Sequence, residues 1–330
     1  MEEEPSLAKA FAQSFRVGAA VNGETVVTHE TLLVRHFNSI TAENAMKFAS
    51  LQPLPDHYRF EEADALVDVA EEHGMAVRGH TLIWHNQTPE WVFRDQSGRL
   101  KSRREVLTTL KDHINRVVSR YRGRVYCWDV VNEAVSDGGD DLLRKSLWLE
   151  TIGEDYLIEA FLAAHDADPQ AQLFYNDYNE CDPQKRAKIC RLIRRLKSEG
   201  VPIHGMGLQA HWHLNSPGID DIERSLNDYA ELGVRLQITE LDISVYNHRE
   251  DPPYRQMTPS LLLQQAERYR AAFRLFKRYA EVIDSVTFWG IADDRTWLDN
   301  FPVRGRKDWP LLFDTDHRPK PAFYAIMEQA

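Results

Sequence analysis

Residues 219–242 read IDDIERSLNDYAELGVRLQITELD. Apolar side chains recur every three or four residues over Ile219–Leu232, which predicts an amphipathic helix. Gly233 follows, and a glycine at this position can adopt the left-handed conformation that ends a helix. The next stretch, Val234–Asp242, is a short apolar strand that ends in polar residues. The segment therefore predicts a helix, a tight turn and a buried strand.

The same order of helix, glycine and strand occurs elsewhere in the chain. A repeated helix–strand unit is typical of a sheet whose strands are parallel and joined by helical crossovers. Another helix is predicted over residues 106–121, where apolar side chains keep the same three-and-four spacing. The two further complete units are Glu61–His73, Gly74 and Met75–Trp84, and then Gln184–Glu199, Gly200 and Gly205–Trp212.

Short apolar runs predict five more strands, which brings the total to eight. Eight strands that alternate with helices are the number that closes a barrel. A doubly wound open sheet is the structural alternative, but no glycine-rich phosphate loop follows the first strand. We therefore expect an α/β fold, a single (β/α)8 TIM barrel that forms one catalytic domain over residues 1–330. The five strands are Phe15–Val21, Ser39–Asn44, Val125–Glu133, Gln172–Tyr178 and Val286–Ile291.

The charge balance is acidic, with 51 Asp and Glu against 40 Lys and Arg and a net charge of −11. Such a surface repels nucleic acid and anionic lipid, so we expect a neutral substrate and neither a nucleic-acid nor a membrane partner. No apolar run is long enough to span a membrane. No pattern of residues indicates a cofactor, and we expect none.

Cysteine usage and the N-terminal sequence indicate the compartment. Cys127, Cys181 and Cys190 have no CxxC spacing and cannot all pair with one another, which is typical of reduced thiols. The sequence Met1-Glu-Glu-Glu-Pro lacks the basic start and apolar run of a secretory signal. A cytoplasmic protein is expected.

Polar side chains gather where the predicted strands end. In a parallel barrel all strands point the same way, so these ends meet at one rim, which is where this fold places active sites. Polarity at a strand end is common, but seven strands that end this way indicate a site. The residues are Glu43, Asn44, His80, Trp84, His85, Asn132, Glu133, Asn176, Tyr178, Gln209, His211, Glu240, Asp242 and Trp289.

Two glutamates, Glu133 and Glu240, close apolar strands. A buried carboxylate is costly unless it is paired, so each belongs either to a structural ion pair or to a functional site. Two on one rim favour the functional interpretation, because glycosidases use one carboxylic acid to protonate the leaving oxygen and a second carboxylate to attack the sugar. Asn132 is placed to bind a sugar hydroxyl. Asp242 is placed to hold His211, which would orient Glu240.

Aromatic residues supply the second requirement of a sugar site. The C–H faces of sugar rings stack on aromatic rings, while their hydroxyls need polar partners. A single tryptophan at such a place is more often part of the core. Four aromatic residues beside a row of amides and imidazoles indicate a carbohydrate cleft, and they are Trp84, Tyr178, Trp289 and Trp297.

The chain resembles the family 10 glycoside hydrolases, which are mostly endo-β-1,4-xylanases, over essentially its whole length. Seven segments carry the resemblance, each at the end of a predicted strand and in the family's order. One small departure is Thr296, where many members have serine. The segments are Thr41–Lys47, Gly79–His85, Trp128–Ala134, Tyr175–Asn179, Gly207–His211, Ile238–Ile243 and Thr287–Ile291.

The resemblance implies a retaining enzyme that cleaves xylan or xylo-oligosaccharides, with Glu133 as acid/base and Glu240 as nucleophile. The separation of the two carboxyl groups is then expected to be about 5–5.5 Å. Tyr178 would serve the cleft near the cut. The resemblance further implies that the second sugar on the non-reducing side is held by Glu43, Asn44 and Lys47. The cleaved sugar would be surrounded by His80, Trp84, Asn132, Gln209 and His211, and Trp289 and Trp297 would close over it. Asp242 and His85 would support these side chains.

Three alternatives stay open at this stage. A cellulase or mannanase would use the same chemistry on another sugar. A metal-dependent barrel hydrolase would use His211 and His213 with His80, His85 and Asp242 as ligands, although amides and indoles occupy much of the rim and we expect no metal. A non-catalytic barrel would bind oligosaccharides without cleaving them, but it would not need two buried glutamates.

Overall fold

Eight parallel strands form a closed barrel in the computed structural model, which describes residues 5–330. The strand order is β1-β2-β3-β5-β6-β7-β9-β10, and β10 closes the circle by pairing with both β9 and β1. The predicted (β/α)8 barrel is confirmed. The strands are β1 (Arg16–Val21), β2 (Ser39–Ala42), β3 (Ala76–Gly79), β5 (Val125–Asn132), β6 (Gln172–Asp177), β7 (Gly205–Leu208), β9 (Arg235–Ser244) and β10 (Ile283–Phe288).

Two of the predicted strands are each split into two. The predicted strand over residues 75–84 becomes β3 and a short β4 (Ile83–Trp84), which pairs with β5. The predicted strand over residues 205–212 becomes β7 and a short β8 (His211–His213), which pairs with β9. Ala210, in the left-handed region at φ 59°, lies in the second break. These breaks lie at the rim and carry predicted site residues.

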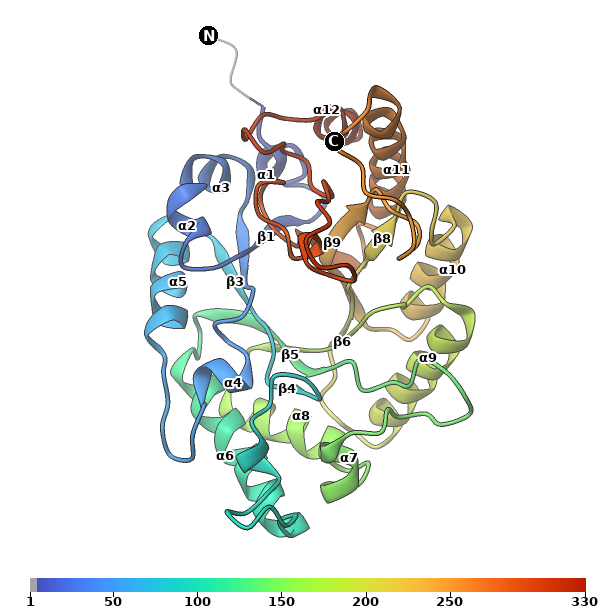
Figure 1. Ribbon diagram of the computed structural model, residues 1–330. Helices are drawn as coiled ribbons and strands as arrows, with labels where there is room; N and C mark the ends of the chain where they lie inside the picture. Colours follow the sequence, from blue (N-terminus) through green and yellow to red (C-terminus); the bar gives the residue numbers. More distant parts are fainter. Residues whose placement is uncertain (1–4) are drawn as a thin grey trace.

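Helices form a ring outside the barrel (Figure 1). Gly74, Gly200 and Gly233 have φ between 64° and 73°, so the predicted left-handed helix ends are confirmed. The helices are α1 (Leu7–Ala10), α2 (Thr25–Thr28), α3 (Glu30–His36), α4 (Phe48–Leu51), α5 (Glu61–Glu72), α6 (Arg103–Arg120), α7 (Leu147–Ile152), α8 (Tyr156–Ala167), α9 (Pro183–Ser198), α10 (Ile219–Ala230), α11 (Pro259–Arg278) and α12 (Pro321–Met327).

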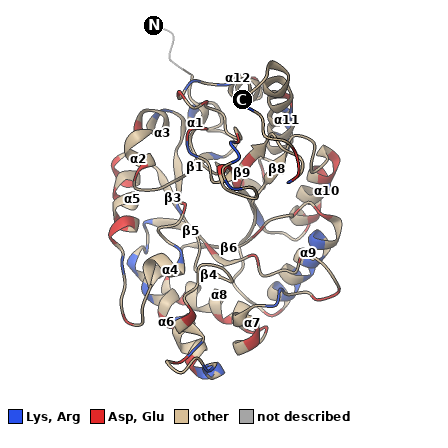
Figure 2. Ribbon diagram, viewed as in Figure 1, with Lys and Arg blue, Asp and Glu red and all other residues tan. Residues whose placement is uncertain are grey.

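Charged residues occur mainly on the helices of this outer ring (Figure 2). The helix α9 is basic along its length, and it forms salt bridges with acidic neighbours such as Asp228, whose carboxylate lies 2.7 Å from Arg186.

Across residues 5–330 there is no helix with the length and apolar character needed to cross a membrane.

A buried polar cluster fills part of the barrel interior. Arg78 on β3 forms an ion pair with Asp129 on β5, and its Nε donates a hydrogen bond of 2.7 Å to Gln237 on β9. Since β3 and β9 are not neighbours in the sheet, this contact crosses the interior. All three side chains are fully buried. The interior is therefore charged as well as apolar directly below the rim.

Gly79 illustrates how tightly the barrel is packed. A Cβ atom added there would lie 2.2 Å from the Trp128 ring, and Trp128 is fully buried. We expect Gly79→Ala to lower the free energy of unfolding by about 1–3 kcal/mol, because an overpacked core must shift to relieve the clash. Urea unfolding measures this. Gly138→Ala is the matched control, since nothing lies within 4 Å of its added Cβ, and equal losses in both variants would contradict the packing argument.

Candidate active site

The predicted rim residues lie at the carboxyl ends of the barrel strands. Asn132 is the last residue of β5 and Glu133 follows it, while Asn176 lies near the end of β6. Gln209 follows β7, and Glu240 lies within β9. The parallel barrel thus brings side chains that are more than 100 residues apart to one rim.

Glu133 has a partly buried carboxylate with two hydrogen-bond donors. Nε1 of Trp84 donates to its Oε2 at 2.8 Å, and Nε2 of Gln209 donates to its Oε1 at 3.1 Å. The pKa of Glu133 is raised to about 7. Burial is the largest cause, the nearby carboxylates Asp177 and Glu240 act in the same direction, and the two donors oppose them. This side chain therefore exists as a carboxylic acid below neutral pH.

Glu240 has the opposite ionisation. Asn176 donates to its Oε1 at 2.8 Å, and Nε2 of His211 lies 3.1 Å from its Oε2. Burial by itself would raise the pKa of Glu240, but His80, His211 and Lys47 together lower it to about 2. Glu240 is therefore an ionised carboxylate, and it is almost fully buried.

Three amide side chains connect the two glutamates. Nε2 of Gln209 is shared between Glu133 and Oδ1 of Asn132, which it reaches at 3.2 Å. Nδ2 of Asn176 is shared between that same Asn132 oxygen, at 2.9 Å, and Glu240. The chain of contacts fixes both carboxylates relative to one rigid amide network.

Below Glu240 lies the buried cluster of the barrel interior. Nδ1 of His80 lies 2.8 Å from Oδ2 of Asp129 and 3.9 Å from Oε1 of Glu240. Asp129 is in turn held by Arg78, whose Nη1 donates to the same Oδ2 at 2.5 Å. The orientation of His80 therefore depends on two residues beneath it.

A second support reaches Glu240 from its other side. Nδ1 of His211 lies 3.0 Å from Oδ2 of Asp242, and Nε1 of Trp297 donates to that oxygen at 2.8 Å. Burial opposes protonation of His211, but Asp242 and Glu240 outweigh it and raise the pKa of His211. A cationic His211 between two carboxylates holds Glu240 in position.

A cleft of about 380 Å³ opens beside this site, and its lining includes Glu43, Trp289 and Trp297. Asn22 donates to Glu43 at 3.0 Å. Nearby, Lys47 donates to Asn44 at 3.1 Å, and its Nζ lies 4.9 Å from the centre of the Trp84 ring. The cleft combines aromatic faces with polar groups.

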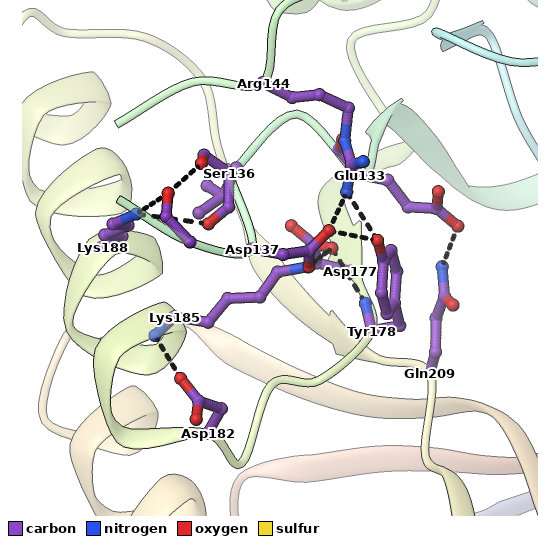
Figure 3. A network of polar contacts seen from close by, with 12 residues as sticks. Glu133, Ser136, Asp137, Arg144, Asp177, Tyr178, Asp182, Lys185, Lys188 and Gln209 are labelled. Carbon is purple, nitrogen blue, oxygen red and sulfur yellow. Dashed lines mark hydrogen bonds and ion pairs between the residues drawn. The ribbon is translucent and has the colours of Figure 1, made fainter. Parts of the chain in front are cut away.

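Tyr178 lies in a polar network that extends from the candidate acid (Figure 3). Its hydroxyl accepts a hydrogen bond from Arg144 at 2.6 Å and donates to Asp137 at 2.5 Å. Nζ of Lys185 stands 3.7 Å above the Tyr178 ring and 2.6 Å from Asp137. Arg144 also donates to the backbone carbonyl of Glu133 at 3.1 Å, which couples the network to the candidate acid.

A second cavity, of about 840 Å³, includes Asp137, His211 and His213 in its lining. It is built by loops that follow β5, β6, β7 and β9, whereas the 380 Å³ cleft is built by loops that follow β1, β2 and β10. The strand order places β1 and β2 opposite β6 and β7 across the barrel mouth. Open space therefore lies on both sides of the glutamate pair.

His85 lies behind the rim. It lines a void of about 10 Å³ together with Trp84, Glu133 and Arg144. Burial lowers the pKa of His85 to about 4, with a smaller effect of Arg144 in the same direction. The ring is therefore neutral and packs behind the candidate acid.

The histidines and Asp242 that would serve a catalytic metal do not converge. Within residues 5–330, one group of three metal-ligating side chains has its donor atoms together, and it contains none of His80, His85, His211, His213 and Asp242. The charge of Asp242 is instead directed at His211 and Trp297. The ligand geometry argues against the metal-dependent alternative.

Sequence reasoning missed three residues of the site. Arg78 and Asp129 were not assigned, although opposite charges inside two apolar strands are a signal that such residues pair. Asn176 was recognised at a strand end but given no role, and its bridging position depends on the distance between β5, β6 and β9. That distance is a property of the closed barrel.

The rim of this (β/α)8 barrel carries one protonated and one ionised glutamate, which amide side chains connect. Aromatic residues of the kind that stack on sugars lie beside them. This combination defines the class of protein as a glycoside hydrolase. The family model "Glycosyl hydrolase family 10" matches residues 6–329. The chain belongs to this family, as the sequence motifs predicted.

Relatives match over almost their full length. An endo-1,4-beta-xylanase of Geobacillus stearothermophilus is 55% identical, with 98% of each chain covered. Endo-1,4-beta-xylanase B of Paenibacillus barcinonensis is 50% identical, with 99% of each chain covered. The crystal structure of xylanase XynB from Paenibacillus barcinonensis, complexed with a conduramine derivative, superposes with a TM-score of 0.98 at 50% identity and covers 100% of both chains.

The Trp84 indole N–H stabilises the ionised form of Glu133, so we expect Trp84→Phe to raise the pKa of Glu133 above about 7. Hydrogen bonds to charged groups contribute about 1.5–3 kcal/mol, which corresponds to about one to two pKa units. Carbon-13 NMR of labelled glutamate side chains measures the titration. Trp91→Phe is the matched control, because the Trp91 indole nitrogen has no hydrogen-bond partner among residues 5–330. An unchanged titration in Trp84→Phe would contradict the assignment.

Proposed function

We propose that the protein is a retaining endo-β-1,4-xylanase that hydrolyses internal bonds of xylan or xylo-oligosaccharides. The observation that carries the proposal is the opposite ionisation of two glutamates on one rim, with pKa values of about 7 for Glu133 and about 2 for Glu240. Double displacement needs one group of each kind. Family membership and the names of the relatives support xylan as the substrate.

In the first step Glu240 attacks the anomeric carbon, and Glu133 gives its proton to the departing oxygen. The bond to the leaving sugar breaks, and a covalent xylosyl-enzyme forms at Glu240. The ester removes the charge of Glu240, which had raised the pKa of Glu133. Glu133, which has given up its proton in the first step, therefore stays ionised and acts as the base that takes a proton from water in the second step. Water attacks the anomeric carbon from the face that the leaving sugar vacated, and the bond to Glu240 breaks. Each of the two steps inverts the anomeric carbon, so the overall configuration is retained.

The cleft favours an enzyme that cuts within a chain. Space on both sides of the glutamate pair lets a polysaccharide pass across the barrel mouth. In this proposal the pentose next to the cleaved bond lies against residues of several strands. The next sugar on the non-reducing side lies beside Glu43. The proposed substrate-binding residues are Glu43, Asn44, Lys47, His80, Trp84, Asn132, Tyr178, Gln209, His211, Trp289 and Trp297, with Asp242 and His85 supporting them.

Residues 1–330 are proposed to act as one catalytic domain, because the family match extends over residues 6–329. The proposed location is the cytoplasm. All three cysteines are free and buried, which suits a reducing compartment. Xylanase activity in separated cytoplasmic and extracellular fractions checks the location.

Reducing-sugar release from xylan and from carboxymethylcellulose tests the substrate. Glucose differs from xylose by a hydroxymethyl group, and one such group changes discrimination by a factor of about 10–200 in a closed pocket. We expect release from xylan to be faster by at least this factor. Equal or faster release from carboxymethylcellulose would favour the cellulase alternative, and binding without any product would favour a sugar-binding barrel.

Azide rescue tests the two glutamate roles. With an activated aryl xyloside, Glu133→Ala should form the xylosyl-enzyme and then stall, because the base that activates water is missing. Azide should restore turnover and yield the β-xylosyl azide. Glu240→Ala should lose cleavage, by at least about a thousandfold. Failure of azide to accelerate Glu133→Ala, together with wild-type rates in that variant, would contradict the assignment.

The pH dependence of kcat/KM follows from the same two groups. Glu133 must be protonated, so activity should fall about tenfold per pH unit above about 7. Glu240 must be ionised, so the corresponding loss on the acid side should begin only near pH 2. Glu133→Ala, with an activated leaving group that needs no proton, should lose the alkaline limb. An alkaline limb that persists in this variant would assign it to another group.

A further inference from the structure

We propose that His29, Asp294 and His317 form a binding site for one divalent transition-metal cation such as Zn²⁺. His29 joins α2 to α3, Asp294 lies in the loop after β10, and His317 precedes α12. One donor atom from each residue lies within 4.8 Å of the others, and no other such group occurs in the part of the chain that the structure describes. The site shares no residue with the glutamate pair and its supports.

The contacts of His29 show which of its nitrogens faces the carboxylate of Asp294. Nδ1 lies 2.8 Å from the Thr28 hydroxyl, whose oxygen also lies 3.1 Å from the backbone carbonyl of Glu24, an acceptor for its single proton. When the hydroxyl donates to the Glu24 carbonyl, its oxygen accepts from Nδ1, which then carries the proton of the ring. In the neutral ring Nε2 is then a bare acceptor, and it lies 2.9 Å from the carboxylate oxygen Oδ1 of Asp294. In this tautomer a cation can be shared between Nε2 of His29 and the carboxylate of Asp294.

The second histidine adds a third donor group to the pair. Nε2 of His317 lies 3.3 Å from the other oxygen of Asp294, and the two imidazole rings are 4.2 Å apart. One divalent cation would bind both neutral rings and the carboxylate together. Two imidazoles and a carboxylate suit zinc, copper or nickel.

The geometry and exposure of the cluster fit such an ion. Donor atoms that share a tetrahedral zinc ion lie about 3.3 Å apart, as bonds of about 2.0–2.1 Å require. Here Nε2 of His29 lies 2.9 Å from Oδ1 of Asp294, and Nε2 of His317 lies 3.3 Å from Oδ2, so each oxygen of the carboxylate faces one histidine. The His29 side chain is 4% exposed, while Asp294 and His317 are each 34% exposed, so an ion can enter from solvent. The Thr28 hydroxyl behind Nδ1 is the kind of partner that orients a metal-binding imidazole.

The position of the cluster indicates a structural role. It connects residue 29 to residues 294 and 317 beside the seam where β10 pairs with β1. His29 and Asp294 also line the 380 Å³ cleft that contains Glu43 and Trp289. A bound ion would hold the loop after β10 against the N-terminal part of the barrel. The expectation of no metal would then be wrong for this part of the protein.

Calorimetric titration of metal-free protein with ZnCl₂ tests the site. We expect about one ion per chain, and a thermal midpoint that rises with added zinc, since a ligand that binds only the folded state stabilises it. Asp294→Asn and His317→Asn should each weaken binding at least about tenfold and remove the shift. Asparagine tolerates the φ of 64° at position 317. His57→Gln, which changes an exposed histidine outside the cluster, is the matched control and should bind as the wild type does.

Absence of saturable zinc binding by the wild type would overturn the proposal, as would undiminished binding in both variants. A measurement without substitutions guards against misfolded variants. Electron paramagnetic resonance of the wild-type protein with one equivalent of Cu²⁺ should detect two coordinated imidazole nitrogens. A spectrum without nitrogen coupling would also overturn the site.

Discussion

The ionisation of Glu240 depends on a row of charges that runs into the barrel. Arg78 and Asp129 are both fully buried, and each would be costly alone in this environment. Their ion pair makes burial tolerable and leaves one Asp129 oxygen 2.8 Å from His80. His80 can therefore face Glu240 in a fixed orientation and help to lower its pKa to about 2. A carboxylate that is buried but ionised is otherwise unfavourable.

Glu133 differs from Glu240 in what surrounds it rather than in its chemistry. It has two neutral donors, Trp84 and Gln209, whereas Glu240 has His211, His80 and Lys47 nearby. Neutral donors offset only part of the desolvation, so the pKa of Glu133 stays near 7. The same side chain can thus be an acid at one strand end and a nucleophile at another. The amide network between them keeps the two environments distinct.

Strand breaks at the rim place several of these groups. The gap between β3 and β4 contains His80, and the gap between β7 and β8 contains Gln209 and is followed directly by His211. All three side chains face the glutamates. Continuous strands were predicted at both places, because the apolar pattern of residues 75–84 and 205–212 has no feature that marks a break. Periodicity reports which residues are buried, while the exact path of the backbone depends on contacts with neighbouring strands.

The sequence by itself determined the eight strands, the helix ends at glycine, the family and the rim residues, because burial pattern and residue type are local properties of the chain. The tertiary structure decided which of these side chains touch. Asn176 bridges Asn132 and Glu240, and Arg78 reaches Gln237 across the interior, only because closure of the barrel brings separate strands together. The opposite pKa values of Glu133 and Glu240 follow from those contacts and from burial, neither of which is encoded in the identity of a glutamate.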